Sequence, residues 1–119
     1  MIVTYNIETR SKIVSLNQYK SLHWRKLKSK IDPLKGEFII RIRKAKMQPL
    51  KWIELTVRHN TNFDMDNVVG TVKPFVDCLR ACKVIEDDTK KQWDKLTIVH
   101  DRSLPKNCTI FEITGEILN

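Results

Sequence analysis

Four aspartates in the segment 62–88 have the types and spacing of metal ligands: Asp64 and Asp66, then Asp87 and Asp88. The first pair follows a strand-like segment, and two residues apart in an extended chain their side chains should point the same way. The second pair lies beyond the next apolar stripe, where the chain returns toward the sheet. Carboxylates that meet at one edge repel one another unless a cation neutralises them. We expect Mg²⁺ there, because it prefers oxygen ligands and leaves positions for the water and phosphate of phosphodiester hydrolysis.

Lys73 is the cation best placed to act with these acids. It lies seven residues after Asp66, which on a helix puts both side chains on nearly the same face, about two turns apart. From there its ammonium group would reach the scissile phosphate or the nucleophile. The alternative is a pair within the helix with Asp77, four residues further on.

Ordinary structural roles compete with each of these assignments. Asp64 or Asp66 can cap the following helix, and Asp87-Asp88 can form a turn. A calcium-binding loop is excluded, because counting from Asp64 places Val68 where an oxygen ligand is required and Phe75 where the closing glutamate belongs.

Neighbouring side chains also have two interpretations each. Asn67 would either orient a carboxylate or cap the helix, and Asp87 would be an additional ligand or a solvated turn residue. Asp77 is expected to hold Lys73 or Arg80. Four aromatic residues offer surfaces for stacking on bases, although packing in the core is the alternative that we favour: Trp24, Trp52, Trp93 and Phe63.

The charge of the chain points to a polyanionic partner. The net charge is +8, although the segment 62–88 is itself acidic. Lysine and arginine neutralise phosphates and release condensed counterions, which gives affinity for nucleic acid without sequence preference. The cations expected to contact DNA lie in the segment 20–30 and in the site itself: Arg25, Lys26, Lys28, Lys30 and Lys73.

Size and composition indicate one domain over residues 1–119. Apolar residues make up 41% of the chain, enough for a core, and no apolar run approaches the roughly 20 residues of a membrane span. The first residues lack the layout of a signal peptide. Cys78, Cys82 and Cys108 are an odd number without zinc-ligand spacing, so we expect reduced cysteines in a cytoplasmic protein.

Hydrophobic periodicity predicts an α/β fold. Strands are expected over 2–7 and 51–59, with two more from Leu96 and from Cys108 to Leu118; helices are expected over 20–30 and from Val68 to near Cys82. Pro33 is expected to break or restart a helix, and residues 34–45 fit either a helix or a short strand. Pro74 predicts a kink, or a helix that starts after Thr71. The order of elements favours one compact domain with a small mixed sheet and two main helices.

The ordered set Asp64-Met-Asp66-Asn67, Lys73, Asp77-Cys-Leu79 and Asp87-Asp88 resembles the signature of RusA-type Holliday junction resolvases. Leu16-Asn17-Gln-Tyr19 and the basic helix after it are similar to that family's N-terminal region, so the resemblance covers nearly the whole chain. One difference is that the segment between Asp66 and Lys73 is about three residues longer than in the family's best-known form. These additional residues would move Lys73 ~4.5 Å along a helix.

The resemblance implies a small homodimeric α/β endonuclease that resolves four-way DNA junctions by paired symmetric nicks in recombination and repair. Its catalytic and metal-binding aspartates would be Asp64, Asp66 and Asp88, and its essential lysine Lys73. The cofactor would be Mg²⁺, with Mn²⁺ as a substitute. Two alternatives remain: a metal nuclease that acts on other branched DNA or on RNA, and a non-catalytic basic DNA-binding protein.

Overall fold

The structure is a computed structural model that describes residues 1–118, except the side chain of Tyr19. Its sheet has four strands, β1 (Ile2–Thr9), β2 (Leu50–His59), β3 (Trp93–His100) and β4 (Thr109–Ile117), in the order β1-β4-β2-β3. Strand β4 pairs antiparallel with β1 and β2, whereas β3 runs parallel to β2. The prediction of a compact α/β domain with a small mixed sheet is therefore confirmed.

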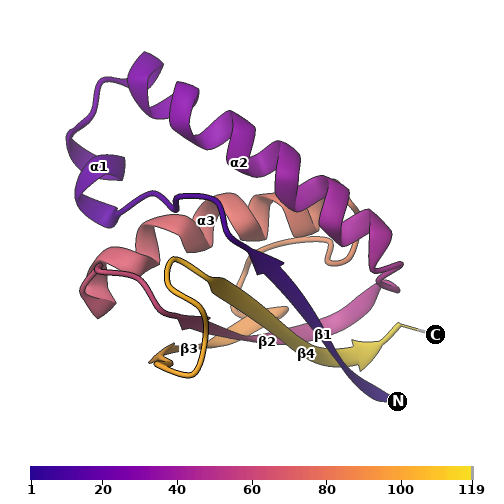
Figure 1. The fold of residues 1–119 in the computed structure, drawn as a ribbon. Coiled ribbons are helices and arrows are strands. Elements are labelled where there is room, and N and C mark those ends of the chain that lie inside the picture. The colour runs from indigo at the N-terminus through magenta and orange to yellow at the C-terminus, as the bar shows by residue number, and fades with distance from the viewer. Residues whose placement is uncertain (119) are drawn as a thin grey trace.

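Three helices lie on one face of this sheet (Figure 1). They are α1 (Leu16–Ser21), α2 (Trp24–Lys44) and α3 (Met65–Ala81). In β2 the side chains of Ile53, Leu55 and Val57 alternate toward the helices and are fully buried. This alternation fixes which face of the sheet receives the helices.

Three phenylalanine rings join the helices to the sheet. The ring of Phe38 from α2 meets those of Phe75 and Phe111 edge-on, with centroids 5.1 and 5.3 Å away. Phe75 from α3 stacks on Phe111 from β4 at 4.0 Å. All three side chains are fully buried, so this cluster sets how α2 and α3 sit above the sheet.

The helix predicted over 20–30 is divided in two. Ser15 caps α1 through a reciprocal capping box with Gln18. The backbone is extended at Leu22, and His23 then caps α2. The segment 34–45 is helical, because Phe38 and Ile42 bury the same face one turn apart.

Neither proline interrupts its helix. Pro33 lies inside α2 on the exposed side, where water can reach the carbonyl that the missing N–H leaves free. Pro74 lies inside α3 and is buried, so its ring packs in the core. The prediction that α3 would begin after Thr71 is therefore wrong; it begins at Met65.

The cysteines carry free thiols, and Cys78 and Cys108 are buried. Burial raises the pKa of the Cys78 thiol to about 11, which makes it a packing group. No helix among residues 1–118 is both long and apolar enough to cross a bilayer.

Candidate active site

The first acidic pair lies where β2 passes into α3. Strand β2 ends at His59, and after a short loop Asp64 is the N-cap of α3, with its carbonyl oxygen accepting from the backbone N–H of Asn67 at 2.9 Å. Asp66 is in the first turn of the helix, and both aspartates are exposed. Negative charge is favourable at this end of a helix. The two side chains do not share an extended segment, because the helix has already begun at Met65.

The carboxylate of Asp64 makes no capping hydrogen bond. Within residues 1–118, neither Asp64 nor Asp66 forms an ion pair. Both therefore present free oxygen atoms to solvent.

Lys73 and Asp88 are in direct contact. Lys73 projects from the middle of α3, and its Nζ donates to Asp88 Oδ2 at 2.8 Å. The same ammonium group lies 3.3 Å from Asp77 Oδ1, one helical turn along. Arg80 adds a longer contact, with Nη1 3.9 Å from Asp88 Oδ2. Asp88 is thus bracketed by two cations from one helix.

The contact keeps both partners charged. The hydrogen bond from Lys73 holds the pKa of Asp88 below its usual value. The same bond raises the pKa of Lys73. In this arrangement Lys73 is a cation and hydrogen-bond donor rather than a neutral base, and it is suited to stabilising negative charge on a phosphate.

The two ends of the predicted site lie apart along α3. Asp88 faces the segment from Lys73 to Arg80, whereas Asp66 is in the first turn, about 10 Å from Lys73 along the helix axis at 1.5 Å per residue. Among residues 1–118, no three His, Cys, Asp or Glu side chains lie together in a way that could hold one metal ion. The structure brings Lys73 and Asp88 together and leaves Asp64 and Asp66 as a separate pair.

The other motif residues, Asn67, Asp87 and Asp77, make structural contacts. Asn67 Oδ1 accepts from the backbone N–H of Asn17 at 3.3 Å, which ties α3 to α1; Asn67 is not the N-cap. Asp87 Oδ1 accepts from the N–H of Asp88 at 2.8 Å and so shapes the turn that presents Asp88. Asp77 pairs with Lys73, as expected, and with Lys35 at 3.4 Å rather than with Arg80.

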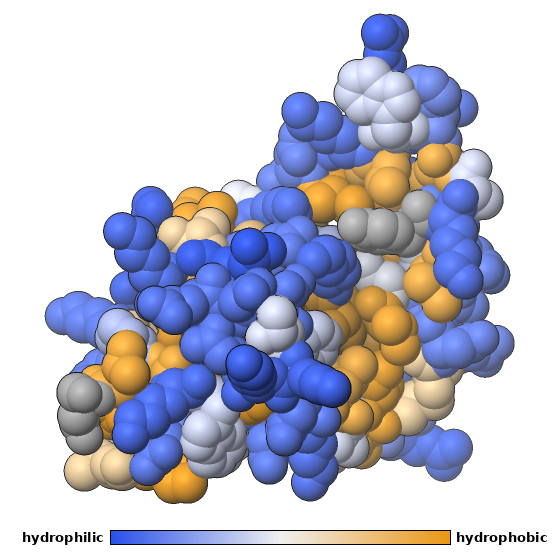
Figure 2. Space-filling view, turned by 180° about the vertical axis from the view of Figure 1, so that it is seen from behind, coloured by the Kyte–Doolittle hydropathy of each residue, from blue (hydrophilic) through white to orange (hydrophobic). Residues whose placement is uncertain are grey.

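Four of the five predicted DNA-binding cations lie in the first half of α2, and the fifth, Lys73, lies in α3. Arg25, Lys26, Lys28 and Lys30 are all exposed. Figure 2 shows hydrophilic residues at the projecting corner of the molecule where α2 begins. A basic helix end of this kind suits a phosphate backbone.

Trp24 departs from the expectation of core packing. Its side chain is 61% exposed at the start of α2, and the Arg25 guanidinium lies 5.3 Å from the ring centroid. Trp52, Trp93 and Phe63 are partly buried, and the last two pack against the core. Only Trp24 of these four combines a large exposed ring with neighbouring cations.

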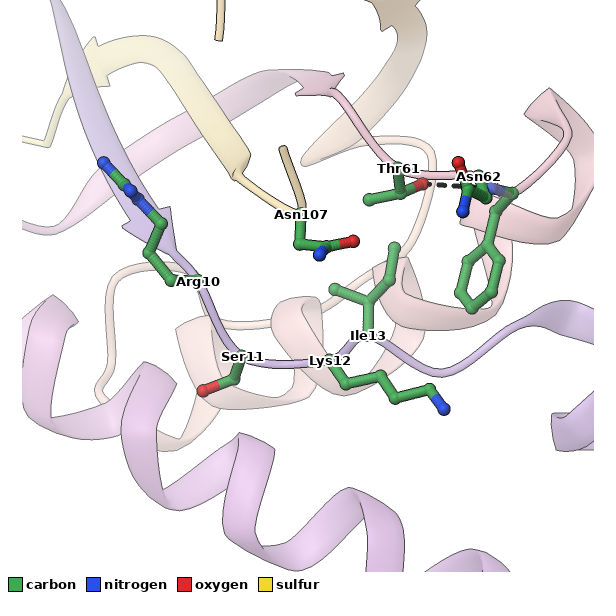
Figure 3. A pocket seen from close by; sticks show the side chains of 8 residues that line it. Arg10, Ser11, Lys12, Ile13, Thr61, Asn62 and Asn107 are labelled. Carbon is green, nitrogen blue, oxygen red and sulfur yellow. Dashed lines mark hydrogen bonds between the residues drawn. The ribbon is translucent and has the colours of Figure 1, made fainter. Parts of the chain in front are cut away.

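A pocket that the sequence did not reveal lies beside the loop before Asp64. It has a volume of about 430 Å³ and is lined by residues from three segments (Figure 3): Arg10, Ser11, Lys12, Ile13, Thr61, Asn62, Phe63 and Asn107. Because these segments meet only in the folded chain, no local pattern marks them.

No protein-family model matches the chain, and no curated protein matches its sequence. Its functional assignment therefore depends on the motif residues and on the contacts that they make.

Proposed function

We propose that this protein is a metal-dependent endodeoxyribonuclease that resolves four-way DNA junctions, as RusA-type resolvases do. The observation that carries the proposal is the 2.8 Å contact between Lys73 and Asp88. The motif predicts that these residues act together although fifteen positions separate them. The fold returns Asp88 to the side of Lys73, as a shared task for the two residues requires.

The metal would be Mg²⁺ or Mn²⁺. Asp64 and Asp66 offer free, exposed carboxylate oxygens, and Mg²⁺ commonly takes only one or two protein carboxylates beside water and substrate phosphate. This donor pair fits the ion. Asp88 could bind the same ion only if it gave up its contact with Lys73. A divalent ion bound there supplies activation of water and neutralisation of charge on the phosphate.

The residues of the chain have separate tasks in this proposal. Asp64 and Asp66 would hold the ion at the N-terminal end of α3. Lys73, about 10 Å along α3 from Asp66, would donate to phosphate oxygens of the bound strand, and Asp88 keeps it oriented and charged. The exposed cations at the start of α2 hold the DNA backbone through charge and counterion release.

A homodimer would match the near two-fold symmetry of a four-way junction. Each protomer would then offer one active site to one of two opposed strands, which gives paired symmetric nicks. This part of the proposal follows from the resemblance, as do roles in recombination and repair. Reduced cysteines are consistent with the cytoplasmic location that we propose.

A non-catalytic DNA-binding protein is the second candidate. It is favoured by the lack, among residues 1–118, of any three-carboxylate group able to hold a metal. In that case Asp64 would serve only to begin α3, and the contact between Lys73 and Asp88 would only fasten the loop after the helix.

A panel of labelled substrates separates these functions. The purified protein is incubated with a mobile four-way junction, a flap, a linear duplex and an RNA hairpin, each with Mg²⁺, with Mn²⁺ and with a chelator. The proposal predicts paired symmetric nicks in the four-way junction only when a metal is present. Equal cutting of the linear duplex rejects junction specificity, and tight junction binding without any nick favours the DNA-binding protein.

A further inference from the structure

The pocket beside the loop before Asp64 has the shape and position of a second binding site. Its walls are the segment 10–13 after β1, the segment 61–63 between β2 and α3, and Asn107 just before β4. Figure 3 shows Ile13, Thr61 and Asn107 facing one another, with the side chain of Arg10 pointing away from them and that of Lys12 extending on the opposite side. Phe63 immediately precedes Asp64 in the chain, so the pocket adjoins the predicted catalytic acids.

The charge of the pocket favours an anion. Arg10 and Lys12 are exposed at its rim, and none of the residues that line it is acidic. Arg10 contacts Glu8 at 3.5 Å outside the pocket, a weak exposed pair. Within residues 1–118, Lys12 has no ion pair. Lys12 is therefore free to meet a phosphate.

Two amides in the pocket have unused hydrogen-bonding groups. In the described part of the chain, the side chains of Asn62 and Asn107 make no hydrogen bond. The backbone N–H of Asn107 donates to the carbonyl of Asn60 at 2.7 Å, so its main chain is held while its amide stays available. An asparagine amide both donates and accepts, which matches the edge of a nucleobase.

The remaining lining can receive the face of a base. Phe63 lines the pocket and is only partly buried, and the buried Ile13 adds to the apolar wall. Aromatic and apolar side chains are the usual platform for an unstacked base. Ser11 is not available to a ligand, because its hydroxyl already donates to Glu37.

We propose that this pocket takes one unstacked deoxynucleotide adjoining the cleavage site. Its base lies against Phe63 with its edge on the amides of Asn62 and Asn107, and its phosphate meets Lys12. Such a pocket would let the protein distinguish the nucleotide beside the cut. The inference rests on the proposed function for DNA as the ligand and for the position beside the cut, whereas binding of a nucleotide in the pocket can be tested without cleavage.

The test measures binding without metal and without cleavage. The ¹⁵N-labelled protein is titrated with the tetranucleotides of dA, dC, dG and dT, and separately with inorganic phosphate, while the side-chain amide signals of Asn62 and Asn107 are followed by NMR. We expect saturable shifts of both amides with at least one tetranucleotide, and weaker binding of phosphate alone.

Two variants sharpen this test. Asn107→Gly removes the amide at a backbone φ of 63°, which glycine adopts without strain, and should weaken tetranucleotide binding about fivefold. Lys12→Gln should also weaken it, whereas Lys95→Gln, an exposed lysine on β3, should leave it unchanged. The inference is overturned if Asn107→Gly binds as well as the wild type, or if inorganic phosphate alone reproduces the shifts with equal affinity.

The two proposals fail separately. A protein that cuts junctions but shows no amide shift loses the nucleotide pocket and keeps its nuclease function. If the pocket binds tetranucleotides but the protein never nicks DNA, the nucleotide pocket is supported and the proposed nuclease function is rejected.

Discussion

Lys73 Nζ lies 2.8 Å from Asp88 Oδ2, and this contact fastens the loop after α3 back onto the middle of that helix. It also gives Asp88, one of the three predicted metal ligands, a cation of the chain as its partner. Asp88 therefore has its negative charge compensated by the chain itself. The contact is the feature on which the proposed chemistry depends, because it orients the only predicted catalytic cation.

The substitution Lys73→Gln tests whether the positive charge of Lys73 is needed for cleavage. Lys73→Gln removes the hydrogen bond that lowers the pKa of Asp88, so that pKa should rise toward its usual value in a carboxyl-carbon NMR titration. Loss of one electrostatic donor to the phosphate should slow junction cleavage about 100-fold. The matched control, Lys90→Gln in the exposed loop, should cleave like the wild type. Unchanged cleavage by Lys73→Gln would remove Lys73 from the site.

The same contact predicts an acid dependence of stability. A carboxyl with a lowered pKa in the folded state stabilises the fold above its unfolded pKa, and this contribution is lost as the pH falls through the folded pKa. Below about pH 4, urea unfolding should therefore show the wild type losing more stability than Lys73→Gln. An equal loss of unfolding free energy in both proteins would show that the contact between Lys73 and Asp88 does not cause the acid dependence.

Two threonines on neighbouring strands should respond in opposite ways. Thr9 and Thr109 are paired in register and fully buried. Thr9 Oγ1 donates to Glu37 Oε1 at 2.7 Å, whereas Thr109 Oγ1 is buried without a partner in the described residues. Thr9→Val should cost about 1–3 kcal/mol and Thr109→Val should be neutral or stabilising, as measured by urea unfolding. A comparable loss for Thr109→Val would show that its hydroxyl has a partner, such as a bound water.

Two helical glycines should also differ. A Cβ on Gly70 would come within 2.6 Å of the Ser15 carbonyl oxygen, where α3 meets the start of α1. Gly70→Ala should therefore destabilise the fold by about 1–3 kcal/mol. A Cβ on Gly36 in α2 meets no atom within 4 Å, so Gly36→Ala should stabilise by roughly 0.5–1 kcal/mol. Thermal unfolding measures both, and equal effects would contradict the close approach of α1 and α3.

The exposed tryptophan at the start of α2 should report DNA binding. Trp24→Ala should weaken junction binding with little effect on stability, because base stacking on an aromatic ring contributes about 1–3 kcal/mol and this ring is 61% exposed. Fluorescence anisotropy with a labelled junction measures the affinity. Trp52→Phe serves as the comparison. It removes only the 3.3 Å hydrogen bond from Trp52 Nε1 to Glu116 Oε2, and Trp52 lies in β2 rather than at the basic end of α2. Equal affinities for Trp24→Ala and the wild type would remove Trp24 from the interface.

Local patterns in the sequence predicted the elements well where burial is periodic. The alternation of Ile53, Leu55 and Val57 predicted β2, and the apolar stripe from Val68 to Leu79 predicted α3 and its end near Cys82. The predicted break at Pro33 and the alternative start of α3 after Thr71 were wrong, because they weighed one lost hydrogen bond and could not include the tertiary packing that holds α2 and α3 together.

The site was harder to predict because its geometry depends on where α3 begins. The sequence predicts that Asp64 and Asp66 lie in one extended segment with their side chains on the same side. Because α3 begins at Met65, Asp64 is instead its N-cap and Asp66 lies in its first turn. The partner of Lys73 depends on the path of the loop after α3, which no periodicity encodes. The pocket around Asn107 joins three distant segments, so only the folded structure could reveal it.

The most direct test compares Asp66→Asn with the wild type on a mobile four-way junction, with cleavage and binding measured on the same samples. Asp94→Asn, an exposed aspartate on β3, is the control. A catalytic metal ligand predicts that Asp66→Asn loses cleavage by at least about 100-fold and keeps or tightens junction binding, while Asp94→Asn behaves like the wild type. Cleavage by Asp66→Asn at the wild-type rate, or a wild type that never nicks the junction with Mg²⁺ or Mn²⁺, would contradict the proposed nuclease.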